Sequence, residues 1–143
     1  MKSSQIQKAL QFHPQTKSTF GGVFARNKVP TIPKRKYISY VVNTDPSHKP
    51  GEHWVAFFFT PSEVYYFDPY GIPPARFERI LNSRRKRHYF GRRLQGLGQT
   101  CGHYCLYFIL CMQTHYAFNI FGNNFNVNDR IVKQFVENHF PYI

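Results

Sequence analysis

The sequence predicts one domain, residues 1–143, that combines helices with strands. Apolar residues recur at helical spacing in four segments, at 4–12, 74–82, 102–116 and 129–139. Runs rich in aromatic and β-branched residues predict strands at 37–43, 53–60 and 64–68. The sequence contains no internal repeat, low-complexity tract or linker that would divide the chain into two domains.

The charge balance and the cysteine count limit the class of protein. Nineteen Lys and Arg against seven Asp and Glu give a formal net charge of +12, which favours contact with polyanions, nucleic acid first. Residues 1–10 are too polar for a signal peptide and no apolar run is long enough to span a bilayer, so we expect a soluble protein. Three cysteines predict free thiols in a reducing, intracellular compartment rather than a disulfide framework.

Capping and breaking residues set the expected ends of the helices. Ser4 is the expected cap of the helix at 4–12, which Pro14 stops. Asn128 is the expected cap of the last helix, after a loop at 117–127. The expected core positions of the two long helices are Tyr104, Cys105, Phe108, Ile109 and Met112, and then Ile131, Val132, Phe135 and Val136.

A predicted hairpin brings a histidine toward a carboxylate. The strands at 53–60 and 64–68 flank a turn that begins at Pro61, and the chain turns at 44–51 before them. If the hairpin is symmetric, His53 lies opposite or nearly opposite Asp68, where paired Cβ atoms are about 5 Å apart. A partner that fixes the tautomer of a histidine is typical of a general base. A structural ion pair at the hairpin end is the alternative interpretation.

A cysteine lies where a glycine-rich loop becomes a helix. Cys101 follows Gly96 and Gly98 and precedes the helix predicted from Gly102. The unpaired N–H groups and the dipole at a helix N-terminus stabilise a thiolate. Cys101 is therefore a candidate nucleophile, and the alternative is a small apolar residue that begins a core helix.

Cys101, His53 and Asp68 together make a Cys-His-Asp set, in which the histidine takes the thiol proton and the carboxylate orients the imidazole. The N–H of Cys101 would supply one oxyanion donor, and the side-chain amide of Gln95 or Gln99 the second. The competing chemistry is a metal site. Possible zinc ligands lie close together in one segment: Cys101, His103, Cys105, Cys111 and His115. Zinc ligands usually come as close pairs from two separated segments, so we expect no metal site here.

A basic segment at 83–93 precedes the glycine-rich loop. Tyr89 and Phe90 interrupt it and would be available to stack on bases. The segment predicts contact with nucleic acid, and a nuclear-import signal and a merely solvated face are the alternatives. The candidate phosphate ligands are Arg84, Arg85, Lys86, Arg87, Arg92 and Arg93.

Three motifs, in this order, resemble the adenovirus protease (adenain) and its relatives, the SUMO-specific proteases. They are Gly51-Glu52-His53-Trp54, the run Tyr66-Phe67-Asp68-Pro69-Tyr70-Gly71, and Gln95 followed six positions later by Cys101-Gly102. Similarity at 20–24, 41–44 and 135–142 extends the resemblance over nearly the whole chain.

The resemblance implies a papain-like α+β fold, in which the helix that carries the nucleophile packs on a mostly antiparallel sheet. It implies His53 as the base, Asp68 as the orienting acid, Cys101 as the nucleophile and Gln95, in preference to Gln99, as the oxyanion donor. It also implies a cysteine endopeptidase, a thiol protease that cleaves viral or transposon capsid or core precursors next to glycine. The substrate would lie in a narrow groove near Trp54 and Gly102.

The sequence departs from the adenovirus enzymes in its third catalytic position, its length and its expected activator. Those enzymes usually have glutamate where this chain has Asp68, which is closer to the SUMO-specific proteases, and this chain is shorter. No cysteine lies at 83–93, where a disulfide-linked peptide activator would attach, so none is expected. The basic segment leaves activation by DNA open.

We therefore expect a monomer that requires no cofactor, has no membrane contact and, if viral, acts in the virion or the host nucleus. Two other functions stay open on the sequence. One is a deconjugating isopeptidase for a ubiquitin-like modifier, which would keep the same chemistry. The other is a non-catalytic DNA-binding virion protein, against which the presence of all four catalytic positions argues.

Overall fold

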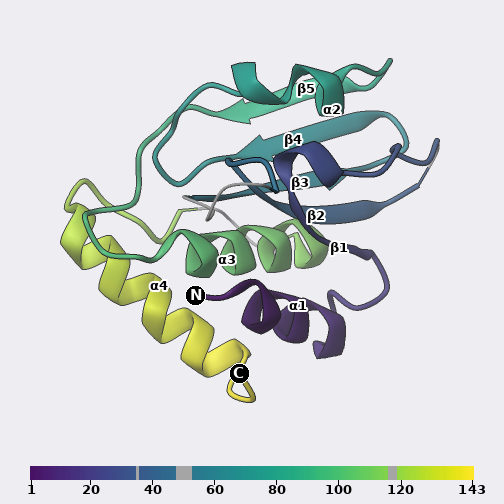
Figure 1. The fold of residues 1–143 in the computed structure, drawn as a ribbon. Coiled ribbons are helices and arrows are strands. Elements are labelled where there is room, and N and C mark those ends of the chain that lie inside the picture. The colour runs from purple at the N-terminus through teal and green to yellow at the C-terminus, as the bar shows by residue number, and fades with distance from the viewer. Residues whose placement is uncertain (35, 48–52, 116–118) are drawn as a thin grey trace.

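A five-stranded mixed sheet follows the order of the chain, β1-β2-β3-β4-β5 (Figure 1). The computed structural model describes residues 1–34, 36–47, 53–115 and 119–143. The two inner pairings, β2 with β3 and β3 with β4, are antiparallel, whereas each edge strand runs parallel to its neighbour. The sheet is therefore evenly mixed, not mostly antiparallel as expected. The strands are β1 Phe20–Ala25, β2 Ile38–Asn43, β3 Trp54–Phe59, β4 Glu63–Phe67 and β5 Lys86–Phe90.

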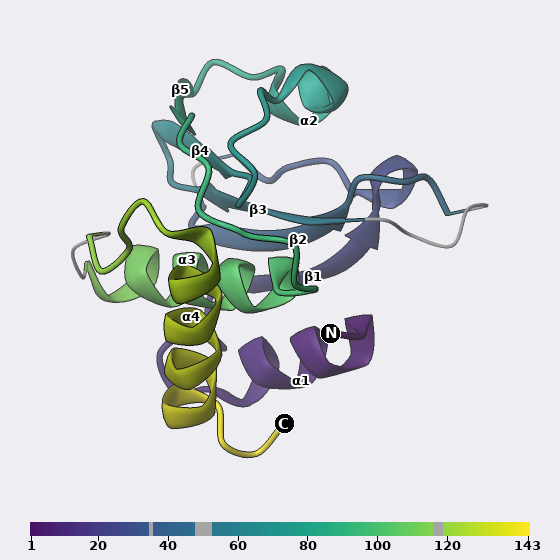
Figure 2. The ribbon, with the colours of Figure 1, turned by 90° about the vertical axis from the view of Figure 1, so that its left-hand side faces the viewer.

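Helices cover both faces of this sheet. α3 packs against one face, with α1 and α4 on its far side, and α2 lies over the other face (Figures 1 and 2). Within the part of the chain that the structure describes, no helix is both long and apolar enough to cross a membrane. The helices are α1 Ser3–Phe12, α2 Glu78–Leu81, α3 Cys101–Thr114 and α4 Phe125–His139, with short 3-10 turns η1 Arg26–Lys28 and η2 Ala75–Phe77.

The central helix, α3, is enclosed on all sides. Every residue from Tyr104 to Cys111 is buried, which is expected of a helix that is apolar around its whole circumference. Complete burial of each large aliphatic or aromatic side chain contributes about 1.5–3 kcal/mol, so this helix is a main source of stability. Because the sheet, α1 and α4 surround it, its first residue, Cys101, is held at a defined place beside the sheet.

The predicted strands at 37–43, 53–60 and 64–68 are confirmed as β2, β3 and β4, with ends that differ by one residue. The two edge strands were not predicted. β1 contains two glycines and an irregular register, and β5 begins with charged residues, so neither has the apolar alternation of a half-buried strand.

Two helix starts differ from the sequence expectation. Ser4 lies inside α1, which begins at Ser3, and the side chain of Gln5 accepts a hydrogen bond of 2.8 Å from the N–H of Lys2. The last helix begins four residues early, at Phe125, because the side chain of Asn124 caps it by accepting from Val127 N at 3.1 Å. Asn128 is not the cap.

The other two predicted helices are present with altered ends. The segment predicted as helix at 74–82 forms η2 followed by α2, and its expected apolar positions, Phe77, Ile80 and Leu81, are buried. α3 ends at Thr114, and residue 116, the expected end, lies outside the described residues. Parts of the predicted turn at 44–51 and of the predicted loop at 117–127 also lie outside them.

Candidate active site

The end of the central hairpin brings His53 and Asp68 together. The β3/β4 ladder ends at the pair Ala56 and Phe67, so by continuation Asp68 follows opposite residue 55, diagonal to His53. His53 Nε2 lies 2.7 Å from Asp68 Oδ1, and the two residues are 8% and 2% exposed. The nearly opposite placement expected from the hairpin is therefore present. With Nε2 engaged, the other ring nitrogen, Nδ1, is left for a second partner.

The turn after β4 holds this pair in position. The N–H of Tyr70 donates to the same Asp68 Oδ1 at 2.8 Å, and the N–H of Gly71 donates to the Asp68 carbonyl at 2.8 Å. Gly71 has φ 69°, a left-handed conformation that strongly favours glycine. The ring of Tyr70 stacks on the His53 imidazole, with centroids 4.7 Å apart and planes at 28°. The imidazole is thus fixed at one edge by a carboxylate and on one face by an aromatic ring.

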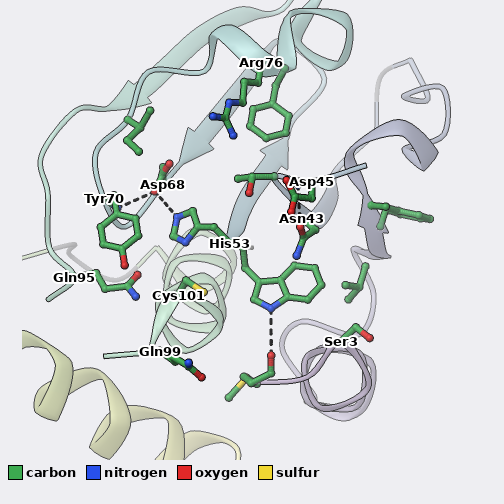
Figure 3. A pocket seen from close by; sticks show the side chains of 18 of the residues that line it. Ser3, Asn43, Asp45, His53, Asp68, Tyr70, Arg76, Gln95, Gln99 and Cys101 are labelled. Atoms are coloured by element: carbon green, nitrogen blue, oxygen red, sulfur yellow. Dashed lines mark hydrogen bonds and ion pairs between the residues drawn. The ribbon is translucent and has the colours of Figure 1, made fainter. Parts of the chain in front are cut away.

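Cys101 is the first residue of α3 and faces the His53 imidazole (Figure 3). The His53 imidazole and the backbone of Trp54 and of Gly102 stabilise the thiolate form of the Cys101 sulfur. The first residue of α3, the residue before β3 and the residue after β4 therefore make up the Cys-His-Asp set. The arrangement matches the chemistry expected of a thiol at a helix N-terminus.

The pKa values of the thiol and the imidazole shift in opposite directions. Burial raises the pKa of the Cys101 thiol, but hydrogen bonds from His53 and from the backbone lower it by more, so it lies below its ordinary value. Burial lowers the pKa of His53, but the hydrogen bonds and charges of Asp68 and Cys101 raise it by more, to about 9. Together the two shifts favour a thiolate beside an imidazolium.

The other two cysteines lie deeper in α3 and have the opposite character. Cys105 is completely buried, and this burial raises the pKa of its thiol well above the ordinary value. Burial also raises the pKa of Cys111 to about 11, although a hydrogen bond from Tyr107 opposes the shift. Of the three thiols, Cys101 is thus the one whose environment favours the reactive form. The described residues contain no group of three or more His, Cys, Asp or Glu side chains that could hold a metal ion.

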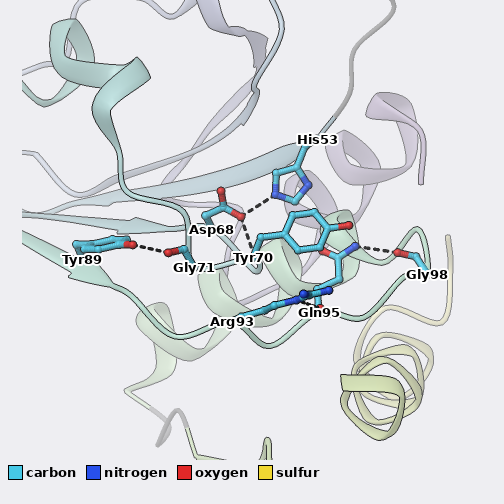
Figure 4. A network of polar contacts seen from close by, with 8 residues as sticks. All are labelled: His53, Asp68, Tyr70, Gly71, Tyr89, Arg93, Gln95 and Gly98. Atoms are coloured by element: carbon cyan, nitrogen blue, oxygen red, sulfur yellow. Dashed lines mark hydrogen bonds and ion pairs between the residues drawn. The ribbon is translucent and has the colours of Figure 1, made fainter. Parts of the chain in front are cut away.

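Gln95 lies beside Cys101 (Figure 3) and is 1% exposed, and Figure 4 shows its polar contacts. Its side-chain amide nitrogen donates to Gly98 O at 2.9 Å, which uses one of two amide hydrogens, and its backbone carbonyl accepts from Arg93 Nε at 2.8 Å. The side-chain oxygen, Oε1, is buried without a hydrogen-bond partner among the described residues. Gln99 is exposed and also borders the site, so both candidate amides lie near the thiol.

These residues line a cavity of about 1070 Å³, which is open to solvent. Trp54 lies in its wall, and its indole N–H donates to Met1 O at 3.2 Å. Gly102 is buried and faces α1, since a Cβ atom there would lie 3.0 Å from Met1 Cβ and 3.3 Å from Ile6 Cδ1. Of the two residues expected to border a substrate groove, Trp54 therefore reaches the cavity, whereas Gly102 permits close packing of α3 on the N-terminal segment.

Four cations of the basic segment have partners within the protein: Arg85, Arg87, Arg92 and Arg93. Arg85 donates to the carbonyl groups of Thr60 and Pro33, both at 2.7 Å. Arg87 pairs with Glu78 at 2.7 Å on the surface. These side chains therefore tie the edge strand β5 to its neighbours.

Arg93 connects the basic segment to the candidate site. Its guanidinium lies over the rings of Tyr70 and Phe125, at 5.4 Å and 4.5 Å from their centroids. Arg84 and Lys86 are exposed, and neither makes a side-chain hydrogen bond or an ion pair with the described residues. Of the two expected stacking residues, Phe90 packs against buried rings and Tyr89 donates to the Gly71 carbonyl. Contact with nucleic acid stays a prediction, with Arg84 and Lys86 as exposed cations that are not engaged by the described residues.

Sequence reasoning assigned no role to two residues that adjoin the site, Tyr70 and Asp129. Tyr70 belongs to a recognised motif, but its stacking on His53 depends on the path of the turn. Asp129 lies at helical spacing from Val132 and Val136, so it occupies the buried face of α4. An acid in an apolar stripe is the signal that would have identified it.

Comparison with known proteins gives one family and one fold. The model of the family described as adenovirus endoprotease matches residues 20–90, just under half of the chain, which include His53 and Asp68. No curated protein matches the chain by sequence. The crystal structure of the ASFV pS273R protease is similar at TM-score 0.62 and 18% identity, over 97% of this chain and 66% of that one. Its selenomethionine form gives TM-score 0.61 and 18% identity, over 98% and 67%. This chain thus spans about two thirds of the length of that protease and shares its fold.

Proposed function

We propose that this adenain-like chain is a cysteine endopeptidase that uses Cys101 as nucleophile, His53 as base and Asp68 as orienting acid. The match of residues 20–90 to the adenovirus endoprotease family and the fold shared with the ASFV pS273R protease support this proposal. The observation that carries the proposal is the 2.7 Å bond between His53 Nε2 and Asp68 Oδ1, with Cys101 facing the same imidazole from the start of α3 (Figure 3). A thiol, a base and an orienting carboxylate in this order are what acyl transfer requires.

The reaction would proceed through a thioester. His53 takes the proton of the Cys101 thiol, and the thiolate attacks the scissile carbonyl carbon. The backbone N–H of Cys101 and the second amide hydrogen of Gln95 donate to the oxyanion. The imidazolium then protonates the leaving amine as the C–N bond breaks. Water, deprotonated by His53, hydrolyses the thioester and restores the thiol.

The proposed substrates are capsid or core precursors of a virus or a related transposon, cleaved next to glycine. The resemblance to viral proteases supports this class and a site of action in the virion or the host cell. The open cavity beside Cys101, whose wall includes Trp54 and Met1, supports binding of an extended segment of chain.

The test combines hydrolysis with labelling of the reactive thiol. Cys101→Ala and His53→Ala should abolish cleavage of capsid precursors and glycine-containing peptides, whereas Cys105→Ala, one helical turn away, should retain it. Iodoacetamide should modify Cys101 first. Loss of cleavage in Cys105→Ala but not in Cys101→Ala would overturn the assignment. A stable adduct of Cys101 with vinyl-sulfone probes of ubiquitin-like modifiers would instead favour a deconjugating isopeptidase, whose substrates are conjugates of such modifiers.

We also propose DNA as an activator that binds the exposed part of the basic segment. The net charge of +12 and the accessible side chains of Arg84 and Lys86 support this. Replacing both by serine should reduce stimulation by DNA, whereas Arg130→Ser, an exposed cation on α4, should not. If cleavage with and without DNA responds identically to ionic strength, the segment does not serve catalysis.

A further inference from the structure

Asp129, on the first turns of α4, joins both ends of the loop that precedes Cys101. Its carboxylate oxygens lie 3.1 Å and 3.2 Å from Gly96 N, which donates to them. The hydroxyl groups of Thr100 and Tyr104 donate to Asp129 Oδ1 at 3.1 Å and 2.8 Å. Asp129 is 7% exposed, so these hydrogen bonds are shielded from solvent and strong.

The loop wraps closely around this carboxylate. A Cβ atom at Gly96 would lie 2.9 Å from Asp129 Oδ2, and one at Gly98 would lie 3.2 Å from the same oxygen. The glycines therefore permit an approach that larger residues would prevent. Residues 96–100 belong to no strand of the described sheet, so the hydrogen bonds to this carboxylate hold the loop in position.

The two oxyanion donors lie directly beside the residues that Asp129 holds. Gly96 follows Gln95, and Thr100 precedes Cys101. The amide of Gln95 also depends on the loop, since it donates to Gly98 O at 2.9 Å. A displacement of the loop would therefore move the side chain of Gln95 and the N–H of Cys101 relative to each other.

We propose that Asp129 is a positioning residue for the oxyanion site, which sets the relative placement of Gln95 and the Cys101 N–H without touching the substrate. This inference rests on the proposed peptidase function. Because misplacement of catalytic groups by about 1 Å can cost about a hundredfold in rate, the expected loss is large. The His53–Asp68 pair, held by the sheet, should remain unaffected.

The test compares a reaction that forms an oxyanion with one that does not. Peptide hydrolysis forms an oxyanion, whereas alkylation of Cys101 by iodoacetamide requires the thiolate alone. In Asp129→Ala, kcat should fall about a hundredfold, with KM nearly constant, whereas the alkylation rate of folded protein should change less than about threefold. Asp129→Asn, which keeps one acceptor oxygen, should recover part of kcat. Glu137→Gln, an exposed acid on the same helix, is the matched control.

The outcomes separate this inference from the proposed function. If hydrolysis and alkylation fall in parallel in Asp129→Ala, or if Asn is no better than Ala, Asp129 has only a structural role and the inference is wrong. Tyr104→Phe, which removes one donor to Asp129 and keeps the ring, gives the same comparison if Asp129→Ala does not fold. If the wild-type chain is alkylated at Cys101 but hydrolyses no peptide, the proposed peptidase function itself is wrong. An oxyanion site would then have no role.

Discussion

The two halves of the candidate site are held by different kinds of interaction. His53 and Asp68 lie at the end of the β3/β4 hairpin, where main-chain hydrogen bonds of the sheet set their separation. Leu94 N and Gln95 N donate to the Pro69 carbonyl at 2.8 Å and 3.0 Å, but residues 96–100 belong to no strand of the described sheet. Side chains hold this loop: Asp129 binds Gly96 and Thr100, and Asn128 Nδ2 donates to Leu94 O at 3.1 Å.

This difference predicts how each half responds to substitution. A sheet end tolerates changes around it, because its geometry depends on backbone groups that every residue carries. A loop held by a few buried side chains depends on those residues in particular. Substitutions in the sheet half should therefore act through the substituted group itself, whereas those in the loop half should act through displacement of neighbours.

The largest effect is expected for Asp68→Ala, with a loss of about 10³-fold or more in kcat/KM. Asp68→Asn should lose only about tenfold, because His53 and Tyr70 both donate to the same oxygen, Oδ1, which an amide oxygen can replace. Steady-state kinetics on one peptide measures both. Equal losses in the two variants would mean that orientation of His53 does not depend on that oxygen, and the sheet half would lose its assigned role.

In the loop half, Gly96→Ala should lower kcat about a hundredfold, because its Cβ atom would lie 2.9 Å from both Asp129 Oδ2 and Asn126 Oδ1. Gly122→Ala is the matched control, since its Cβ atom would meet no atom within 4 Å. The ratio of peptide hydrolysis to iodoacetamide alkylation is the measurement. Unchanged hydrolysis in Gly96→Ala would show that the loop tolerates displacement and would remove the contrast with the sheet.

A smaller effect is expected at Tyr70, whose ring stacks on the His53 imidazole. Tyr70→Ala should lower kcat about three- to tenfold, in line with the loss of one aromatic contact, and Tyr70→Phe should stay near wild type. Rates are to be compared at equal folded concentration, measured by near-UV circular dichroism. A loss in Tyr70→Phe as large as in Tyr70→Ala would assign the effect to the hydroxyl group rather than to the ring.

The smallest expected effect is a displacement of the pH profile. With increasing pH, activity should first rise as the Cys101 thiol loses its proton, at a pH below the ordinary thiol pKa. It should then fall as His53 loses its proton near pH 9. Asp68 raises the pKa of His53, so Asp68→Asn should move the alkaline limb to lower pH. The profile of kcat/KM for the free enzyme measures both limbs. An alkaline limb that stays in place in Asp68→Asn would contradict this electrostatic coupling.

Much of the fold follows from local patterns. The apolar run before Thr60 and its returning partner are confirmed as a hairpin, and its symmetry placed His53 beside Asp68. The start of α3 at Cys101 agrees with the glycine-rich loop before it. The edge strand β5 was not predicted, because its pattern Lys86-Arg87-His88 is that of a solvated segment. Asn128 was mistaken for a cap because capping preference alone does not distinguish it from Asn124.

The sequence by itself determined which side chains would form the candidate Cys-His-Asp set, because hairpin pairing and a helix start depend on neighbours along the chain. Only the tertiary structure decided how the loop before Cys101 is held and which cations remain accessible. Asp129 and Gly96 are far apart in sequence, as are Arg85 and Pro33, and the burial of a charged group depends on the segment that covers it. That information resides in the packing of α4 and the sheet edge, which no local pattern encodes.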